Sequence, residues 1–118
     1  DFYELYDMTM AQPPFVPDVV KEGVAERFQA RKEELAKIFD DFHDKDSLEP
    51  HLSAITSPIL ILWGAKDEVI HVSSAKVWDK GLPNSELKIW PDVGHMPMVE
   101  IPEESAAVYR DFLLSASK

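Results

Sequence analysis

Two side chains in this sequence could act together in acid–base catalysis: the carboxylate of Asp67 and the imidazole of His95. A carboxylate that accepts a hydrogen bond from one ring nitrogen of a histidine fixes the tautomer of the ring and stabilises its protonated form. The other ring nitrogen is then free to act as a general base near neutral pH. Asp67 and His95 could therefore supply two of the three residues of a catalytic triad.

Each of these residues follows a segment typical of a β-strand. Asp67 lies four residues after the apolar run 59–63, and His95 lies five residues after the segment 86–90. A helix predicted over residues 73–80, capped by one of its first two serines, would connect the strands and make them parallel. Loops at the carboxyl ends of neighbouring parallel strands open into one crevice, so both side chains are expected there. The spacing alone also fits a β-α-β unit without catalytic function.

The remaining patterns predict which faces are covered. The run Ile59–Trp63 is continuously apolar, which is typical of a strand covered on both faces. Pro102 and the two glutamates after it favour the start of a last helix. Four residues of that helix recur at helical spacing and are predicted to be buried: Ala106, Tyr109, Phe112 and Leu113.

The first part of the sequence predicts helices only. Asp18 is the expected N-cap of a helix whose apolar pattern continues to Phe42, with Gly23 as a possible break. Three of its apolar residues are predicted to be core of this segment rather than substrate contacts: Phe28, Leu35 and Phe39. Because the strand pattern begins after Glu49–Pro50, we place the boundary between the two parts there.

The residues around Asp67 and His95 resemble the C-terminal part of the α/β-hydrolase family, and most of all its lipase, esterase and C–C-bond hydrolase members. The resemblance is carried by the segments 63–67 (Trp-Gly-Ala-Lys-Asp) and 93–102 (Val-Gly-His-Met-Pro-Met-Val-Glu-Ile-Pro), and it covers about residues 50–118. It implies that Asp67 is the acid of the triad and His95 its base.

This resemblance implies an α/β fold with two parts. Residues 50–118 would form the last two parallel strands of the α/β-hydrolase core with their flanking helices, and residues 1–49 part of a helical cap, or lid, over an apolar substrate. Met96 and Met98 are candidate substrate contacts, although packing explains them equally well. Aromatic residues near the start of the chain could line a pocket or simply pack: Phe2, Tyr3 and Tyr6.

The nucleophile of this family lies in a G-x-S-x-G turn, and the sequence contains no such motif. Its four glycines, Gly23, Gly64, Gly81 and Gly94, never flank a serine at that spacing. Since the serine precedes the acid and the base in the family, and the chain begins with Asp1, we expect a truncated or processed chain that is inactive alone. Either the N-terminal part of the same protein or a second copy, across an exposed sheet edge, is expected to complete it.

Composition narrows the functional classes. The 22 acidic and 12 basic residues give a formal net charge of −10, which argues against nucleic acid or an anionic membrane as partner. The sequence has no cysteine, which excludes disulfides and thiolate chemistry and favours a cytoplasmic location without excluding secretion. Its apolar runs are far shorter than the roughly 20 residues of a membrane span.

Neither a cofactor nor a metal ion is expected. The group His43, Asp44, Asp46 and His51 matches no standard metal-site spacing, and a solvated helix end is the favoured interpretation. His71 stands where the α/β-hydrolase family often has proline, and we interpret it as a surface histidine.

The sequence thus predicts part of a serine hydrolase that acts on acyl esters, similar to a lipase or esterase. One alternative is a C–C-bond hydrolase or a haloperoxidase-type member of the same family, because these share the aspartate and the histidine. Another is a catalytically silent interaction module. A G-x-S-x-G motif after an apolar strand in the upstream coding sequence would favour the hydrolase.

Overall fold

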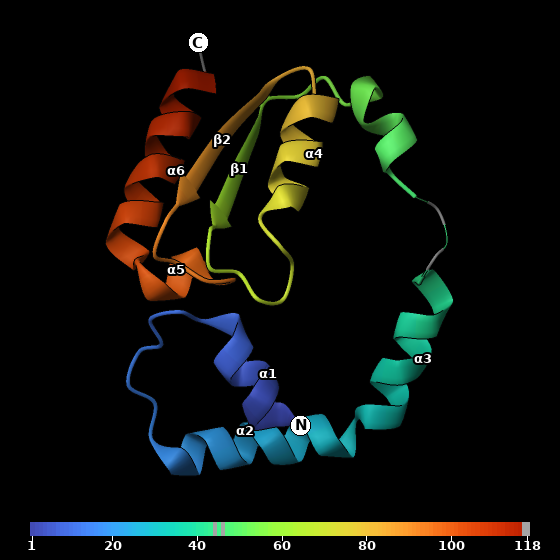
Figure 1. The fold of residues 1–118 in the computed structure, drawn as a ribbon, viewed down its shortest axis with the longest axis vertical. Helices are drawn as coiled ribbons and strands as arrows, with labels where there is room; N and C mark the ends of the chain where they lie inside the picture. The colour runs from blue at the N-terminus through green and yellow to red at the C-terminus, as the bar shows by residue number, and fades with distance from the viewer. Residues whose placement is uncertain (44, 46, 117–118) are drawn as a thin grey trace.

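The computed structural model describes residues 1–43, 45 and 47–116. The first part of the chain is helical, and the second combines strands with helices (Figure 1). The elements in chain order are α1 (Phe2–Thr9), α2 (Asp18–Ala30), α3 (Lys32–Phe42), the 3₁₀ helix η1 (Glu49–Ala54), β1 (Ile59–Gly64), α4 (Ser73–Gly81), β2 (Ser85–Trp90), α5 (Pro97–Glu100) and α6 (Pro102–Ala116).

The two strands confirm the predicted β-α-β-α unit. β1 and β2 pair in parallel, in a register that runs from Ile59 opposite Ser85 to Gly64 opposite Trp90. The helix α4 connects them, and α4 and α6 lie on opposite sides of the strands (Figure 1). Because the strands are parallel and in register, the loops that follow Gly64 and Trp90 leave the sheet at the same end.

The core lies between α4, η1 and one face of the sheet. It contains Leu52, Ile61, Ala75 and Leu82, all buried, and half-buried side chains pack against it: Ile55, Ile59, Trp63 and Leu87. Side chains alternate between the faces of a strand, so Leu60 and Leu62 of β1 point to the other side, where they are only half-buried. Since α4 packs on one face of β1 and α6 on the other, the strand is covered on both faces as predicted, although the burial on the α6 side is only partial.

The burial predicted for α6 is wrong. Tyr109 and Leu113 are 54% and 46% exposed, and Ala106 is exposed as well. Only Phe112 of the predicted four is half-buried, and it lies on the same face of the helix as the buried Ser105, seven residues earlier. The apolar periodicity marks a wider face than a two-stranded sheet can cover, because each strand adds less than 5 Å of width.

The helical break lies at Arg31 and not at Gly23. Gly23 is an interior residue of α2, whereas Arg31 separates α2 from α3 with φ −104° and ψ 8°. The Arg31 side chain turns to Glu34 in the first turn of α3, and its hydrogen bond lowers the pKa of that carboxyl. The predicted cap is shifted too: Pro17 is the N-cap of α2, and Asp18 occupies its first turn.

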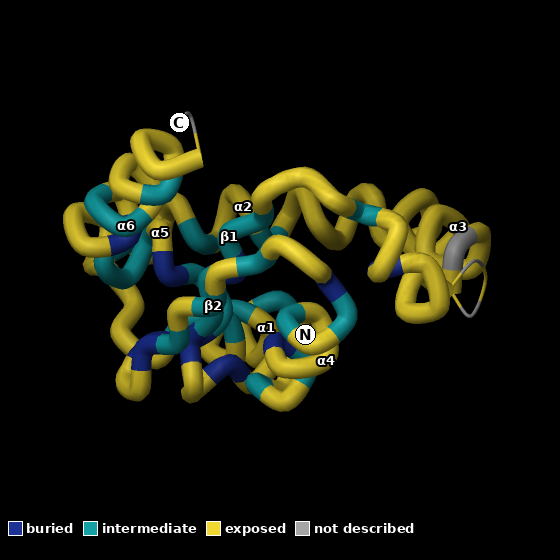
Figure 2. The backbone as a smooth tube through the Cα atoms, turned by 90° about the horizontal axis from the view of Figure 1, so that it is seen from above, coloured by how far each residue is buried: buried dark blue, intermediate teal, exposed yellow. Residues whose placement is uncertain are grey.

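The apolar residues of α2 and α3 do not form a core. Phe28, Leu35 and Phe39 are 46%, 36% and 50% exposed, contrary to the prediction. The helix α2 packs on α1 and on α3, and Figure 2 shows long exposed stretches along α2 and α3. Their apolar surface is thus open in this chain.

Candidate active site

Asp67 is held in a fixed orientation by the turn that follows β1. Its Oδ1 accepts hydrogen bonds from the backbone N–H groups of Val69 (2.9 Å) and Ile70 (2.8 Å). The residue is 7% exposed. A buried carboxylate needs such donors, and with both of them on Oδ1 the second oxygen is available to another group.

The loop that carries His95 lies directly against the loop that carries Asp67. Ala65 N–H donates to Trp90 O (2.8 Å), and Lys66 N–H donates to Val93 O (2.9 Å). A Cβ at Gly64 would come within 2.0 Å of the backbone oxygen of Gly94, so only glycine permits this approach. The two loops therefore form one unit at the end of the sheet.

The structure brings the two predicted side chains together. His95 Nδ1 lies 2.8 Å from Asp67 Oδ2. A carboxylate only accepts hydrogen bonds, so this contact requires the proton on Nδ1 and leaves Nε2 of the neutral ring as an acceptor. The Asp67 side chain is 3% exposed and that of His95 36%, so the acid is shielded while the ring can be reached. Such a pair can remove a proton from a hydroxyl group placed at Nε2.

A small cavity of about 80 Å³ adjoins this pair. It is lined by Leu62, Trp63, Gly64, Asp67 and His95. The two methionines predicted to contact substrate are not among these residues: Met96 is half-buried in the loop, and Met98 is 61% exposed on α5. Their contact with an apolar substrate stays a prediction.

The start of the chain contacts the His95 loop, which no pattern in the sequence predicts. His95 N–H donates to Thr9 O at the end of α1 (2.9 Å), and Gln12 Nε2 donates to Asp92 O (2.8 Å). A Cβ at Gly94 would lie 2.7 Å from Ala11 N, so this glycine also permits a close approach. The partners are separated by 80 or more residues and meet largely through main-chain atoms, which leaves no pattern in the side chains.

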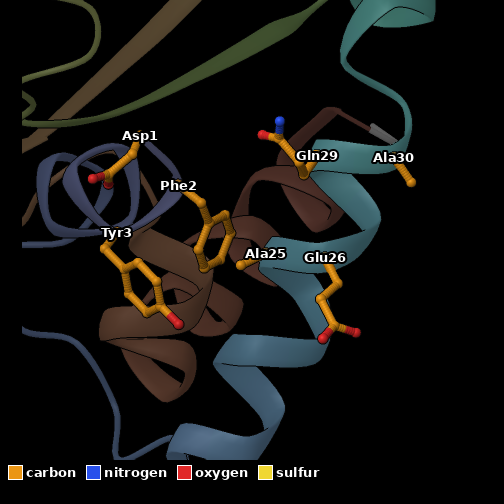
Figure 3. A pocket seen from close by; sticks show the side chains of 7 residues that line it. All are labelled: Asp1, Phe2, Tyr3, Ala25, Glu26, Gln29 and Ala30. Atoms are coloured by element: carbon orange, nitrogen blue, oxygen red, sulfur yellow. The ribbon is translucent and has the colours of Figure 1, made fainter.

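A larger pocket of about 620 Å³ lies between α1 and α2 (Figure 3). Its lining includes Phe2 and Tyr3, which agrees with the prediction that these aromatic residues line a pocket. The pocket shares no residue with the cavity at His95. Tyr6 is not part of the lining. Its ring packs against Phe2 and lies 5.3 Å from Lys21 Nζ.

His71 is exposed, as predicted, and stabilises the start of α4. Its Nδ1 accepts a hydrogen bond from Ser73 N–H (3.3 Å) and contacts Ser73 Oγ (3.0 Å). The predicted serine cap is wrong, since Val72 is the N-cap and Ser73 is the first residue of the helix.

Within the described residues, no cluster of three histidine, cysteine, aspartate or glutamate side chains could hold a metal ion. Asp44 and Asp46 of the sequence group considered above lie outside those residues. None of the described helices is long and apolar enough to cross a membrane.

Comparison with known proteins yields close sequence relatives, although no family model matches. The chain is 36% identical to Lipase 1 of Psychrobacter immobilis and 33% identical to Lipase 3 of Moraxella sp. (strain TA144), each over 115 residues. Each alignment covers 95% of this chain but 36% of the relative, so the chain spans about a third of the length of these relatives. The solved structure of a membrane phospholipase A superposes with a TM-score of 0.92 at 37% identity, over 99% of this chain and 38% of that one.

The fold and these relatives define the class of protein. The chain belongs to the α/β-hydrolase family and carries the C-terminal part of its fold: two parallel strands with flanking helices after a helical segment. Within that family its relatives are lipases. The family and the fold class expected from the segments 63–67 and 93–102 are thus confirmed.

Proposed function

We propose that this chain supplies the acid and the base of a serine hydrolase that cleaves acyl esters of apolar, lipid-like substrates. In this proposal Asp67 is the acid and His95 the base. The observation that carries it is the 2.8 Å hydrogen bond from His95 Nδ1 to a carboxylate that is buried and fixed by two further backbone donors. The names of the relatives, which are lipases, support the substrate class.

The proposed chemistry follows from the tautomer. With its proton on Nδ1, the His95 ring takes the proton of a serine hydroxyl at Nε2 while the serine oxygen attacks the ester carbonyl. The same proton then passes from Nε2 to the alcohol that leaves, and a water molecule repeats the two steps on the acyl-enzyme. Asp67 stays ionised throughout and stabilises the imidazolium. The serine, in a G-x-S-x-G turn, belongs to a segment outside these 118 residues.

The division into two parts is a proposal as well. Residues 1–49 would be part of a cap over the substrate, and residues 50–118 the end of the catalytic core. The exposed apolar residues of α2 and α3 support an acyl chain as the group covered by this cap, because burial of apolar surface favours contact with an apolar group. These residues include Val24, Phe28, Leu35, Ile38 and Phe39.

The test uses the longer protein with its upstream sequence and a series of p-nitrophenyl acyl esters. His95→Ala is expected to lower kcat by about a thousandfold or more, as loss of a triad member does. The matched control is His51→Ala, which removes an exposed histidine from η1 and should change kcat less than twofold. Equal effects of the two substitutions would contradict the proposal.

A further inference from the structure

The carboxylate of Glu100 is surrounded by main-chain donors of the loop that holds His95. Gly94 N–H lies 2.9 Å from Oε1 and 3.1 Å from Oε2 of Glu100, and Met96 N–H lies 3.4 Å from Oε1. These two amides belong to the residues immediately before and after His95. Glu100 therefore accepts hydrogen bonds from the loop on both sides of His95.

The same carboxylate also binds the segment that follows α1. Gln12 N–H donates to Glu100 Oε2 at 2.9 Å. Three residues earlier, Thr9 O accepts the hydrogen bond from His95 N–H. One side chain thus connects the loop of His95 with the segment whose carbonyl oxygen satisfies the backbone of His95.

Only a carboxylate fits this position. Met96 N–H approaches Oε1 of Glu100, Gln12 N–H approaches Oε2, and Gly94 N–H lies within reach of both oxygens. A carboxylate accepts at both oxygens, whereas the amide of glutamine would turn an NH₂ group toward at least one of these donors. Hydrogen bonds to a charged acceptor are also stronger than those to a neutral one.

We propose that Glu100 is a positioning residue for His95. It holds the loop on both sides of the histidine, and by fastening Gln12 it keeps Thr9 O in place for His95 N–H. These contacts keep the imidazole of His95 aligned with Asp67. A displacement of residues 9–12 would therefore also move the imidazole. The proposal rests on the proposed function of His95 as the general base, since the position of its ring affects catalysis only if the ring takes part in the reaction.

The experiment compares Glu100→Gln with Glu103→Gln in the 118-residue chain by NMR. Both substitutions remove one negative charge, but Glu103 is exposed in the first turn of α6. The first readout is the hydrogen-exchange rate of the His95 amide relative to that of Ala65, whose amide bonds Trp90 O away from Glu100. The second is the resonance of the His95 Nδ1 proton, which reports the hydrogen bond to Asp67.

Glu100→Gln is expected to raise the His95-to-Ala65 exchange ratio about tenfold, as loss of one charge-assisted hydrogen bond does, and to shift or broaden the Nδ1 proton. Glu103→Gln should leave both unchanged. An unchanged ratio in Glu100→Gln would overturn the proposal, and so would equal acceleration of both amides, which means general destabilisation. Neither readout needs turnover, so a failure of the proposed function would show separately, as ester hydrolysis that survives His95→Ala.

Discussion

At the scale of single residues, the orientation of Asp67 decides what His95 can do. Its Oδ1 is occupied by the amides of Val69 and Ile70, so only Oδ2 faces the histidine. An asparagine at this position would keep its carbonyl oxygen on the two amides and present its NH₂ group to the ring. The ring would then have to accept at Nδ1 and carry its proton on Nε2, where it cannot act as a base.

Asp67→Asn is therefore expected to switch the neutral tautomer of His95 from the Nδ1-protonated to the Nε2-protonated form. Nitrogen-15 chemical shifts of the ring in the 118-residue chain distinguish the two forms. Asp111→Asn, an exposed substitution on α6, is the matched control. A ring that keeps its proton on Nδ1 in the Asp67→Asn variant would show that Asp67 does not set the tautomer.

At the scale of elements, the close approach of the two strand-end loops defines the geometry of the pair. Gly64 allows the backbone at Val93 and Gly94 to lie where a Cβ would otherwise be. Gly23 is the opposite case, an interior helical glycine at which an added Cβ would have nothing within 4 Å. The same substitution should therefore have opposite effects at the two positions.

Gly64→Ala is expected to destabilise the chain by about 3 kcal/mol or to prevent its folding, because the clash involves backbone that cannot move aside. Gly23→Ala is expected to add about 0.5–1 kcal/mol to the free energy of unfolding, the usual cost of glycine inside a helix. Urea unfolding followed by circular dichroism measures both. Tolerance of alanine at residue 64 would mean that the two loops do not meet as described.

The pairing of Asp67 with His95 could be predicted because its signals are local. An apolar strand, a turn with a carboxylate and a glycine-histidine loop each occupy a few adjacent residues, and parallel strands bring their ends together. The face of α6 could not be predicted in the same way, because periodicity does not tell how many strands lie beneath the helix. The contacts of Thr9 and Gln12 with the His95 loop join main-chain groups far apart in sequence, so no residue pattern indicates them.

At the scale of the whole molecule, the chain is more open than its length requires. Its accessible surface is 8780 Å², against about 6500 Å² for a compact protein of this mass. Its radius of gyration is 16.8 Å, whereas a compact domain of this length would have a radius of gyration of about 13–14 Å. Large apolar residues are exposed on α2, α3 and α6. Such a surface favours association, either with further parts of the same protein or with a second copy.

The isolated 118-residue chain is accordingly expected to self-associate and to show no esterase activity. Sedimentation velocity over a range of concentrations measures the first property, and an assay with p-nitrophenyl esters the second. A compact monomer that melts cooperatively at low concentration would contradict the expected association. Ester turnover that disappears on His95→Ala would contradict the expected inactivity.

The most direct test of the central claim, that Asp67 and His95 act as one unit, is a double-mutant cycle on ester hydrolysis in the longer protein. If they do, His95→Ala alone should cost about as much in kcat as His95→Ala combined with Asp67→Asn, because the acid has no role without its base. Independent effects that multiply in the double variant, or activity that survives His95→Ala, would contradict the account.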